Sequence, residues 1–341
     1  MSESVEEIAI ANSPGQMNKT IIHIGIHKTA STFLQTQIFP KFKGFTLLTR
    51  PYTQHNSTFN KLQFADDTLY DAGQTGDELR SLGNNLLISD ESFAGITLNC
   101  SVINRSVIAK RFSEIFPDAS IVLFIRGQQD ALVSHYHNYV ENVRGTLSIE
   151  EFFWYPEREY SLSEYNYDYY APYPPETLYI NTNRRNFHLD ELKYFNLIRL
   201  YKHYFKDVHV FLYEDFKKNQ QKVLLELESI AGEELQDMED VNVKKRVLKS
   251  LSPKDHVVKR IENYWLGFGN SVRKTRPMRY LARGMGLLSR PFLDPKAVEK
   301  DQEYLTNRTR SHYVSDNDLI IEHYPEIGIQ HYPEKYLSSV R

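Results

Sequence analysis

Five short apolar runs divide this chain, and most are followed by a segment whose apolar residues recur at helical spacing. The runs span residues 21–26, 44–48, 86–88, 121–125 and 208–212. Continuous apolar runs of this length are typical of strands that are buried on both faces of a parallel sheet. Strands that alternate with helices pair in parallel through right-handed crossovers. The sequence therefore predicts an α/β fold of three layers, with a central parallel sheet flanked by helices.

The segments between the runs predict the helices. Helical spacing covers residues 33–38, 104–116, 129–142, 196–205 and 217–230. Residues 51–85 are polar and mixed, which indicates loops with one short helix. We expect residues 20–341 to form a single domain with loop insertions, and residues 1–19, which are polar and acidic, to form a disordered tail rather than a secretion signal.

The overall composition narrows the class of protein. The chain has 341 residues and a net charge of −3, which does not indicate a nucleic-acid-binding protein. A single cysteine, Cys100, excludes an intramolecular disulfide and a cysteine-based metal site, and it indicates a reducing compartment. No apolar run approaches the roughly 18 residues of a membrane-spanning helix, so a cytoplasmic location is expected.

Polar chemistry concentrates where the first run ends. The run breaks at Gly25 to Lys28 and turns into a helical pattern, so free N–H groups and the positive end of a helix dipole point at one spot. Lys28 adds a full positive charge, and hydroxyl donors follow at Thr29, Ser31 and Thr32. This combination suits a phosphate group. A strand–turn–helix that carries a lysine by chance is the alternative.

The loop lacks the Walker spacing, in which a lysine directly follows the second of two glycines. Its pattern, His23-x-Gly25-x-x-Lys28-Thr29-Ala30-Ser31-Thr32, resembles the 5′-phosphosulfate loop of sulfotransferases that use 3′-phosphoadenosine 5′-phosphosulfate (PAPS). Ala30 stands where that family usually has Gly. The resemblance implies a P-loop-like nucleotide-binding fold. It also implies a 5′-phosphosulfate site formed by His27, Lys28, Thr29, Ala30, Ser31, Thr32 and Phe33.

A second candidate anion site follows the most apolar run, which Arg126 ends. An arginine fork combined with a hydroxyl suits a phosphate monoester. The pattern of Arg126, Asp130, Ala131, Ser134 and Tyr136 is similar to the 3′-phosphate motif of the same family. The resemblance therefore assigns Arg126 and Ser134 to the 3′-phosphate. Taken alone, an arginine after a strand is more often a partner in a surface ion pair.

Two later stretches extend the resemblance. Residues Val208–Phe216 are similar to a strand that is followed by Tyr-Glu-Asp-Phe in these enzymes, and Asp316–Leu319 and Gly328–Tyr332 resemble the family's closing helix and tail. Glu214 and Asp215 are interpreted as structural, because acidic residues stabilise the first turn of a helix.

The resemblance also implies a mechanism. A sulfuryl group moves from PAPS to a hydroxyl or amine of an acceptor by in-line displacement, and 3′-phosphoadenosine 5′-phosphate (PAP) leaves. Lys28 is the candidate for stabilising the charge that builds on the leaving phosphate. Glu91, just past the third strand, is the candidate base, with Asp90 as the second candidate and a helix-capping role as the alternative for Glu91. The sequence shows no metal-ligand cluster, and this chemistry needs no metal.

Besides His23, three histidines lie in or near these motifs. His27 is adjacent to Lys28 and is a candidate catalytic residue, in contact with the sulfate or the acceptor. A histidine also stays open as the base, beside Glu91 and Asp90. His135 and His137 belong to the helix that carries Ser134, and a structural role is the more frequent one for such residues.

Aromatic residues gather in one stretch of about residues 150–190, which we interpret as an insertion. They are Phe152, Phe153, Trp154, Tyr155, Tyr160, Tyr165, Tyr167, Tyr169, Tyr170, Tyr173 and Tyr179. Aromatic rings with hydroxyl tips suit sugar rings, so the acceptor is expected to be a carbohydrate or a glycolipid. An insertion that packs on its own rings is the alternative.

Residues 241–290 hold 13 Lys and Arg against two acidic residues, a net charge of +11 that leaves −14 for the rest of the chain. By the same resemblance, Lys245 and Arg246 are expected to cover a phosphate of the nucleotide. The remaining basic residues fit a peripheral contact with an anionic membrane, a polyanionic acceptor or a solvated face, and all three stay open.

The leading interpretation is a PAPS-dependent sulfotransferase. One alternative is a P-loop small-molecule kinase, which needs Mg²⁺ and a Walker-type acid. Another is a non-enzymatic module that binds nucleotides or glycans. The sequence carries no prediction of the oligomeric state.

Overall fold

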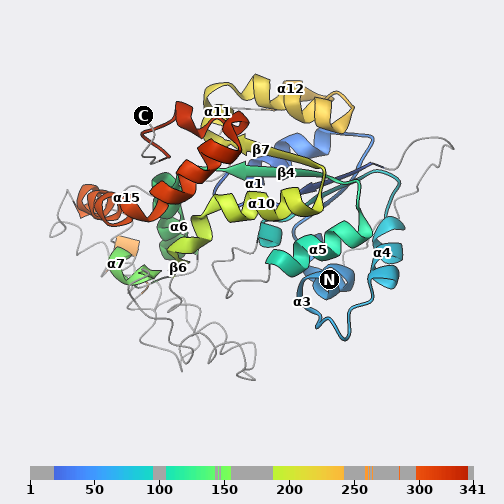
Figure 1. Ribbon diagram of the computed structural model, residues 1–341, viewed down its shortest axis with the longest axis horizontal. Coiled ribbons are helices and arrows are strands. Elements are labelled where there is room, and N and C mark those ends of the chain that lie inside the picture. The colour runs from blue at the N-terminus through green and yellow to red at the C-terminus, as the bar shows by residue number, and fades with distance from the viewer. Residues whose placement is uncertain are drawn as a thin grey trace.

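The computed structural model describes residues 19–94, 105–142, 145, 147–154, 187–241, 258, 259, 261, 263, 284 and 297–336. Its centre is a five-stranded sheet with the order β2–β3–β1–β4–β7, in which all neighbours are parallel (Figure 1). The strands are β1 (Thr20–His23), β2 (Thr46–Thr49), β3 (Leu86–Ser89), β4 (Ser120–Ile125) and β7 (Asp207–Leu212). Each coincides with a predicted run, so the predicted α/β fold with a central parallel sheet is confirmed.

Helices cover both faces of the sheet, because successive side chains of a strand point to opposite faces. Ile22 of β1 packs into one apolar cluster and Ile21 packs into the other. The Ile22 side is covered by α3 (Ser57–Phe64), α4 (Ala72–Arg80), α5 (Arg105–Ile115), α6 (Gln128–Asn142), α10 (Tyr194–Tyr204) and α15 (Ala297–His323). The Ile21 side is covered by the π-helical turn η1 (Leu34–Ile38), α11 (Tyr213–Lys218) and α12 (Gln220–Ala231). Figure 1 shows α11 and α12 on one side of β4 and β7, with α5 and α10 on the other.

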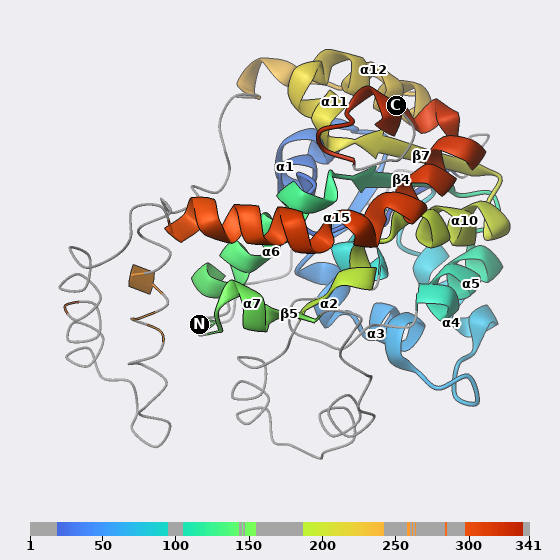
Figure 2. The same ribbon diagram turned by 60° about the vertical axis from the view of Figure 1, so that its left-hand side comes forward.

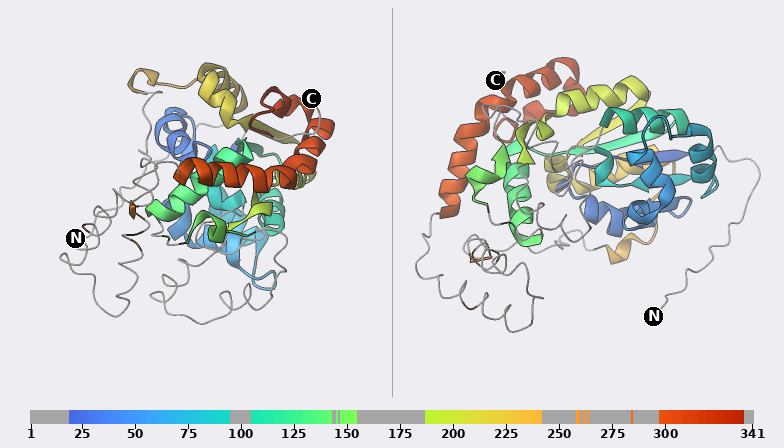
Figure 3. Two further views of the ribbon diagram at one scale, coloured as in Figure 1. Left: turned by 90° about the vertical axis from the view of Figure 1, so that its left-hand side faces the viewer. Right: turned by 90° about the horizontal axis from the view of Figure 1, so that it is seen from below.

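Shorter elements connect these layers. They are α1 (Ser31–Phe33), η2 (Phe39–Lys41), α2 (Tyr52–His55), η3 (Glu91–Ala94), α7 (Ile149–Phe152), β5 (Phe153–Trp154), β6 (Phe187–His188), η4 (Leu189–Leu192), η5 (Met238–Asp240), η7 (Pro325–Ile327) and η8 (Ile329–His331). The long helix α15 runs beside α6 and then past α10, and the chain after it ends near α11 and α12 (Figures 2 and 3).

The strand order fixes where a ligand can bind. After β1 the chain adds β2 and β3 on one side of it, and then crosses to add β4 and β7 on the other side. The carboxyl ends of β1 and β4 therefore flank the point at which the strand order reverses. Open parallel sheets bind their ligands in the crevice at such a point.

Three details of the prediction were wrong. The first strand ends at His23 rather than at Ile26, because the chain bends away into the next loop. Residues 51–85 form three helices rather than one, and two of them begin at residues that bind their first turn, since Asn56 accepts hydrogen bonds from the N–H groups of α3 and Asp71 accepts one in α4. The predicted helix 217–230 is divided at Asn219, which caps α12.

Several predicted segments lie outside the described residues. They are the tail up to residue 18, most of the aromatic insertion (155–186), and almost all of the basic segment, including Lys245 and Arg246. Within the described part of the chain, no helix has both the length and the apolar character that crossing a membrane requires.

Candidate functional site

The loop between β1 and α1 wraps tightly over the end of the sheet. Gly25 passes directly above the His23 ring, because a Cβ atom at Gly25 would lie 2.7 Å from both His23 Cε1 and Ser31 Oγ. Lys28 and Ala30 both adopt the left-handed conformation, with φ of 74° and 71°. Turns of this kind direct successive N–H groups into a concave surface that binds anions.

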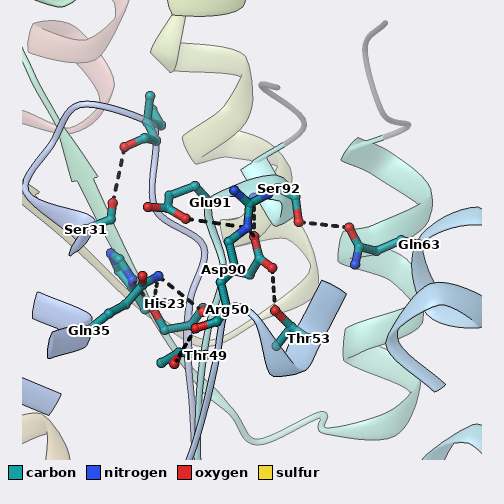
Figure 4. Close-up of polar contacts among 12 residues, drawn as sticks. His23, Ser31, Gln35, Thr49, Arg50, Thr53, Gln63, Asp90, Glu91 and Ser92 are labelled. Carbon is teal, nitrogen blue, oxygen red and sulfur yellow. Dashed lines mark hydrogen bonds and ion pairs between the residues drawn. The ribbon is translucent and has the colours of Figure 1, made fainter. Parts of the chain in front are cut away.

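Two hydroxyls of the loop are used to hold it closed. Thr29 Oγ1 donates to the Ile26 carbonyl at 2.5 Å. Ser31 Oγ donates to the same carbonyl at 3.4 Å (Figure 4). The helix that follows starts at Ser31, and Ala30 contributes no side-chain cap. The first N–H groups of this helix, at Ser31, Thr32 and Phe33, have no partner within the helix and are directed toward the loop.

Lys28 is held against α6. Its Nζ donates to Asn138 Oδ1 at 2.6 Å, and its side chain is half-buried. Burial lowers the pKa of Lys28 below its usual value; Glu141 and Glu91 oppose this decrease, and Arg126 adds to it. Two carboxylates and a second cation are therefore close enough to interact with the Lys28 ammonium group.

Arg126 joins the second motif to the first. It follows β4, and its Nη1 donates to the Lys28 carbonyl at 3.1 Å. Its guanidinium carbon lies 4.7 Å from the centre of the Tyr213 ring, and its Nε is buried without a hydrogen-bond partner. Ser134 lies one helical turn before Asn138, so the two residues share a face of α6. No hydrogen bond joins Ser134 to Arg126, although both are in the described part of the chain.

The two acidic candidates after β3 have different surroundings (Figure 4). Asp90 is fully buried and saturated, since its carboxylate accepts from Thr53 Oγ1 at 2.5 Å and from the Ser92 N–H at 2.8 Å, and lies 2.9 Å from Arg50 Nε. Glu91 is 7% exposed, and its nearest cation is the same Arg50 Nε at 4.0 Å. Asp90 is therefore fixed in a structural network, whereas Glu91 is close enough to Lys28 for their charges to interact.

Three histidines around the loop have lowered pKa values, mainly because of burial. The His23 Nδ1 pairs with Ser89 Oγ at 2.7 Å, and burial lowers the pKa of His23 to about 3. Burial lowers the pKa of His27, with Glu91 opposing, and the His27 Nε2 is buried without a partner. Burial lowers the pKa of His135 well below its usual value, and its ring packs 4.6 Å from that of Phe187. All three imidazoles are neutral at pH 7.

Three residues of the site were not predicted from the sequence. Asn138, Arg50 and Tyr213 each contact a predicted site residue. Tyr213 lies in a stretch that the resemblance covers, but no role was predicted for it. Of the other two, only Asn138 had a usable pattern, because it lies four residues after Ser134 on a predicted helix. His137 is half-buried on the same helix. Among the described residues, no group of three or more His, Cys, Asp or Glu side chains is arranged to hold a metal ion.

No protein-family model and no curated protein matches this chain. Among solved structures, it is similar to a sulfotransferase from Alicyclobacillus acidocaldarius, with 15% sequence identity, a TM-score of 0.42, and coverage of 78% of this chain and 99% of that chain. It is also similar to the mouse sulfotransferase SULT7A1 complexed with PAP, with 14% identity, a TM-score of 0.34, and coverage of 86% of this chain and 85% of that chain.

Proposed function

We propose that this protein is a PAPS-dependent sulfotransferase. The main support is the order of side chains along one edge of the sheet. The carboxyl ends of the neighbouring strands β3, β1 and β4 carry Glu91, Lys28 and Arg126 in that order. The two cations, Lys28 in the centre and Arg126 on one side, suit a substrate with two phosphates. The carboxylate of Glu91 on the other side suits an acceptor that must lose a proton.

The donor groups fit such a nucleotide. The left-handed positions at Lys28 and Ala30 shape a nest for an anion, and the buried Arg126 Nε and His27 Nε2 have no hydrogen-bond partner among the described residues. In this proposal His27 to Phe33 hold the 5′-phosphosulfate, and Arg126 and Ser134 hold the 3′-phosphate. Lys28 stabilises the charge on the leaving phosphate. When bound, PAPS supplies the sulfuryl group.

Glu91 is the proposed base. Asp90 is unsuited to this role because three partners saturate its carboxylate. Within the described part of the chain, the one ion pair of Glu91 is its long contact to Arg50, and Glu91 also interacts electrostatically with Lys28. In this proposal Glu91 accepts the proton of an acceptor hydroxyl while the acceptor oxygen attacks sulfur in line with the leaving phosphate. The aromatic composition of residues 150–190 supports a carbohydrate or glycolipid acceptor. Lys245 and Arg246 are proposed to cover a phosphate of the nucleotide.

A thermal-shift titration tests this function directly. The full chain is heated with increasing PAP and, in parallel, with ATP and Mg²⁺. A ligand that binds only the folded protein stabilises it by about 2.7 kcal/mol at one hundred times its dissociation constant. We expect a shift with PAP and none with ATP and Mg²⁺. A shift with ATP and Mg²⁺ alone would instead support a kinase, and no shift with either nucleotide would overturn the assignment of both anion sites.

A further inference from the structure

The peptide group between Arg126 and Gly127 is held on both sides by distant residues. Its carbonyl accepts a hydrogen bond from the Tyr194 hydroxyl of α10 at 2.8 Å. Its N–H donates to Glu214 Oε1 of α11 at 3.1 Å. Tyr194 and Glu214 are both buried. Since a peptide group is planar and rigid, fixing its two polar ends fixes the direction in which the chain presents the Arg126 side chain.

Glu214 is itself held by the end of the chain. The hydroxyl of Tyr336 donates to Glu214 Oε2 at 2.8 Å, and Tyr336 is 1% exposed. Burial raises the pKa of Tyr336 well above its usual value, so its hydroxyl remains a donor. The two carboxylate oxygens of Glu214 thus connect the C-terminal segment to the backbone of the Arg126 turn.

The residue before Tyr336 packs on the same turn. A Cβ atom at Gly127 would lie 2.8 Å from Lys335 Cβ and 2.9 Å from the Lys335 carbonyl oxygen, so a glycine is required by this close approach. Lys335 Nζ also lies 2.9 Å from Asp130 Oδ2 in the first turn of α6. The end of the chain therefore contacts the turn through packing, an ion pair and a relayed hydrogen bond.

We propose that Lys335 and Tyr336 form a C-terminal brace that positions Arg126 for the 3′-phosphate, with Glu214 as the positioning residue that connects them. This inference rests on the proposed function, because it takes Arg126 to bind that phosphate. Neither Glu214 nor Tyr336 touches the nucleotide in this arrangement. Their effect is confined to the part of the binding energy that the 3′-phosphate contributes.

Binding of two nucleotides to the full chain tests the brace. PAP carries the 3′-phosphate, and adenosine 5′-monophosphate (AMP) is the same molecule without it. Calorimetry gives the dissociation constant of each for the unaltered protein, for Tyr336→Phe and for Glu214→Gln. We expect Tyr336→Phe to weaken PAP about tenfold, since it removes a hydrogen bond to a charged group, and to leave AMP unchanged. Glu214→Gln keeps an acceptor for the Gly127 N–H, and should retain most of the affinity for PAP.

Tyr332→Phe is the matched control. Tyr332 lies in the same C-terminal segment and donates to Asp215 Oδ1 at 2.5 Å. Asp215 is next to Glu214 in sequence, but in the described part of the chain no hydrogen bond or ion pair joins the Asp215 side chain to Arg126 or Gly127. This variant should bind PAP and AMP normally. The brace is overturned if Tyr336→Phe binds PAP normally, if it weakens PAP and AMP equally, or if Glu214→Gln weakens PAP as much as Tyr336→Phe does. If the unaltered protein binds PAP and AMP equally, the 3′-phosphate site of the proposed function is itself wrong.

Discussion

Two neighbouring segments at the carboxyl ends of the strands are held in different ways. One is the Lys28 loop, residues 24–30 between β1 and α1, and the other is the Arg126 turn, residues 126–127 between β4 and α6. The Lys28 loop is closed by bonds over three to five residues, from Thr29 and Ser31 to the Ile26 carbonyl. The Arg126 turn is fixed by Tyr194, 68 residues away, and by Glu214, which Tyr336 reaches over 122 residues. The hydrogen bonds that close the loop are thus local, although Asn138 and Arg126 also hold Lys28 from distant parts of the chain. The turn is held by distant residues, so its geometry depends on the packing of α10, α11 and the C-terminal segment.

In the proposed enzyme, we expect the loop to determine mainly the rate of transfer and the turn to determine mainly the affinity for the nucleotide. A local loop can carry the reacting charge in a fixed geometry with few partners. A turn that depends on remote elements is suited to affinity, because each of those elements can adjust it. Variants on the two sides should therefore separate the rate of transfer from the binding of the nucleotide.

Replacing Lys28 with Ala should have the largest effect. The variant removes the charge proposed to stabilise the leaving phosphate, and loss of such a group costs about a thousandfold in rate. PAP should still bind through its 3′-phosphate, because Tyr194 and Glu214 hold the Arg126 turn and the hydrogen bond of Arg126 goes to the Lys28 carbonyl rather than to its side chain. Transfer of radioactive sulfate from labelled PAPS measures the rate. Lys43→Ala, at a lysine that is 49% exposed, is the control. A fully active Lys28→Ala protein would disprove the mechanism.

Glu91→Gln should come next, with a loss of about a hundredfold in transfer from removal of the base. The change keeps the size of the side chain and lies on the side of Lys28 opposite to Arg126. PAP affinity should therefore remain close to normal while the rate falls. Glu114→Gln, at a surface residue of α5, controls for the loss of one negative charge. Equal activity of Glu91→Gln and the unaltered protein would exclude Glu91 as the base.

The same difference explains what the sequence could and could not predict. Gly25, Lys28 and Thr29 follow one another in a strand–turn–helix, so their proximity needed no knowledge of the fold. The strands were predictable because their apolar runs are continuous, and the strand ends then placed Glu91 and Arg126 at one edge. The contacts of Asn138 with Lys28 and of Tyr213 with Arg126 were not predictable, because the placement of α6 and α11 against the loop depends on packing across the whole domain.

Acidification should destabilise the protein through His23, on the loop side of the site. Burial lowers the pKa of His23 to about 3 in the folded protein, against 6.5 for the ordinary residue. Between pH 6.5 and pH 3, His23 is therefore protonated in the unfolded state but neutral in the folded state. The free energy of unfolding consequently falls as the pH falls through this window. At pH 5.5, this histidine lowers the free energy of unfolding by about 1.4 kcal/mol relative to its value well above pH 6.5. The tyrosines that fix the turn stay protonated over this range.

Urea unfolding at pH 7.5 and pH 5.5 measures this effect. The His23→Gln variant should be less stable at both pH values, because it loses the fit beneath Gly25, but its stability should change less between them. A variant with the full pH dependence of the unaltered protein would show that His23 is not responsible.

The smallest effect is expected at Ala30, which stands where the sulfotransferase loop that this chain resembles usually has Gly. Ala30 has φ of 71°, and the left-handed conformation costs a residue with a Cβ atom about 1–2 kcal/mol. Glycine avoids this cost but loses more chain entropy on folding, so Ala30→Gly should raise the free energy of unfolding by about 0.5 kcal/mol. Ala109→Gly, within α5, is the contrasting variant and should lower the free energy of unfolding by about 1 kcal/mol.

Because the hydrogen bonds that close the loop are local, Ala30→Gly should leave the Arg126 turn and the preference for PAP over AMP unchanged. A changed preference would mean that the two sites are coupled through their shared contact at the Lys28 carbonyl, and a lower stability would mean that the entropy cost of glycine exceeds the strain at Ala30.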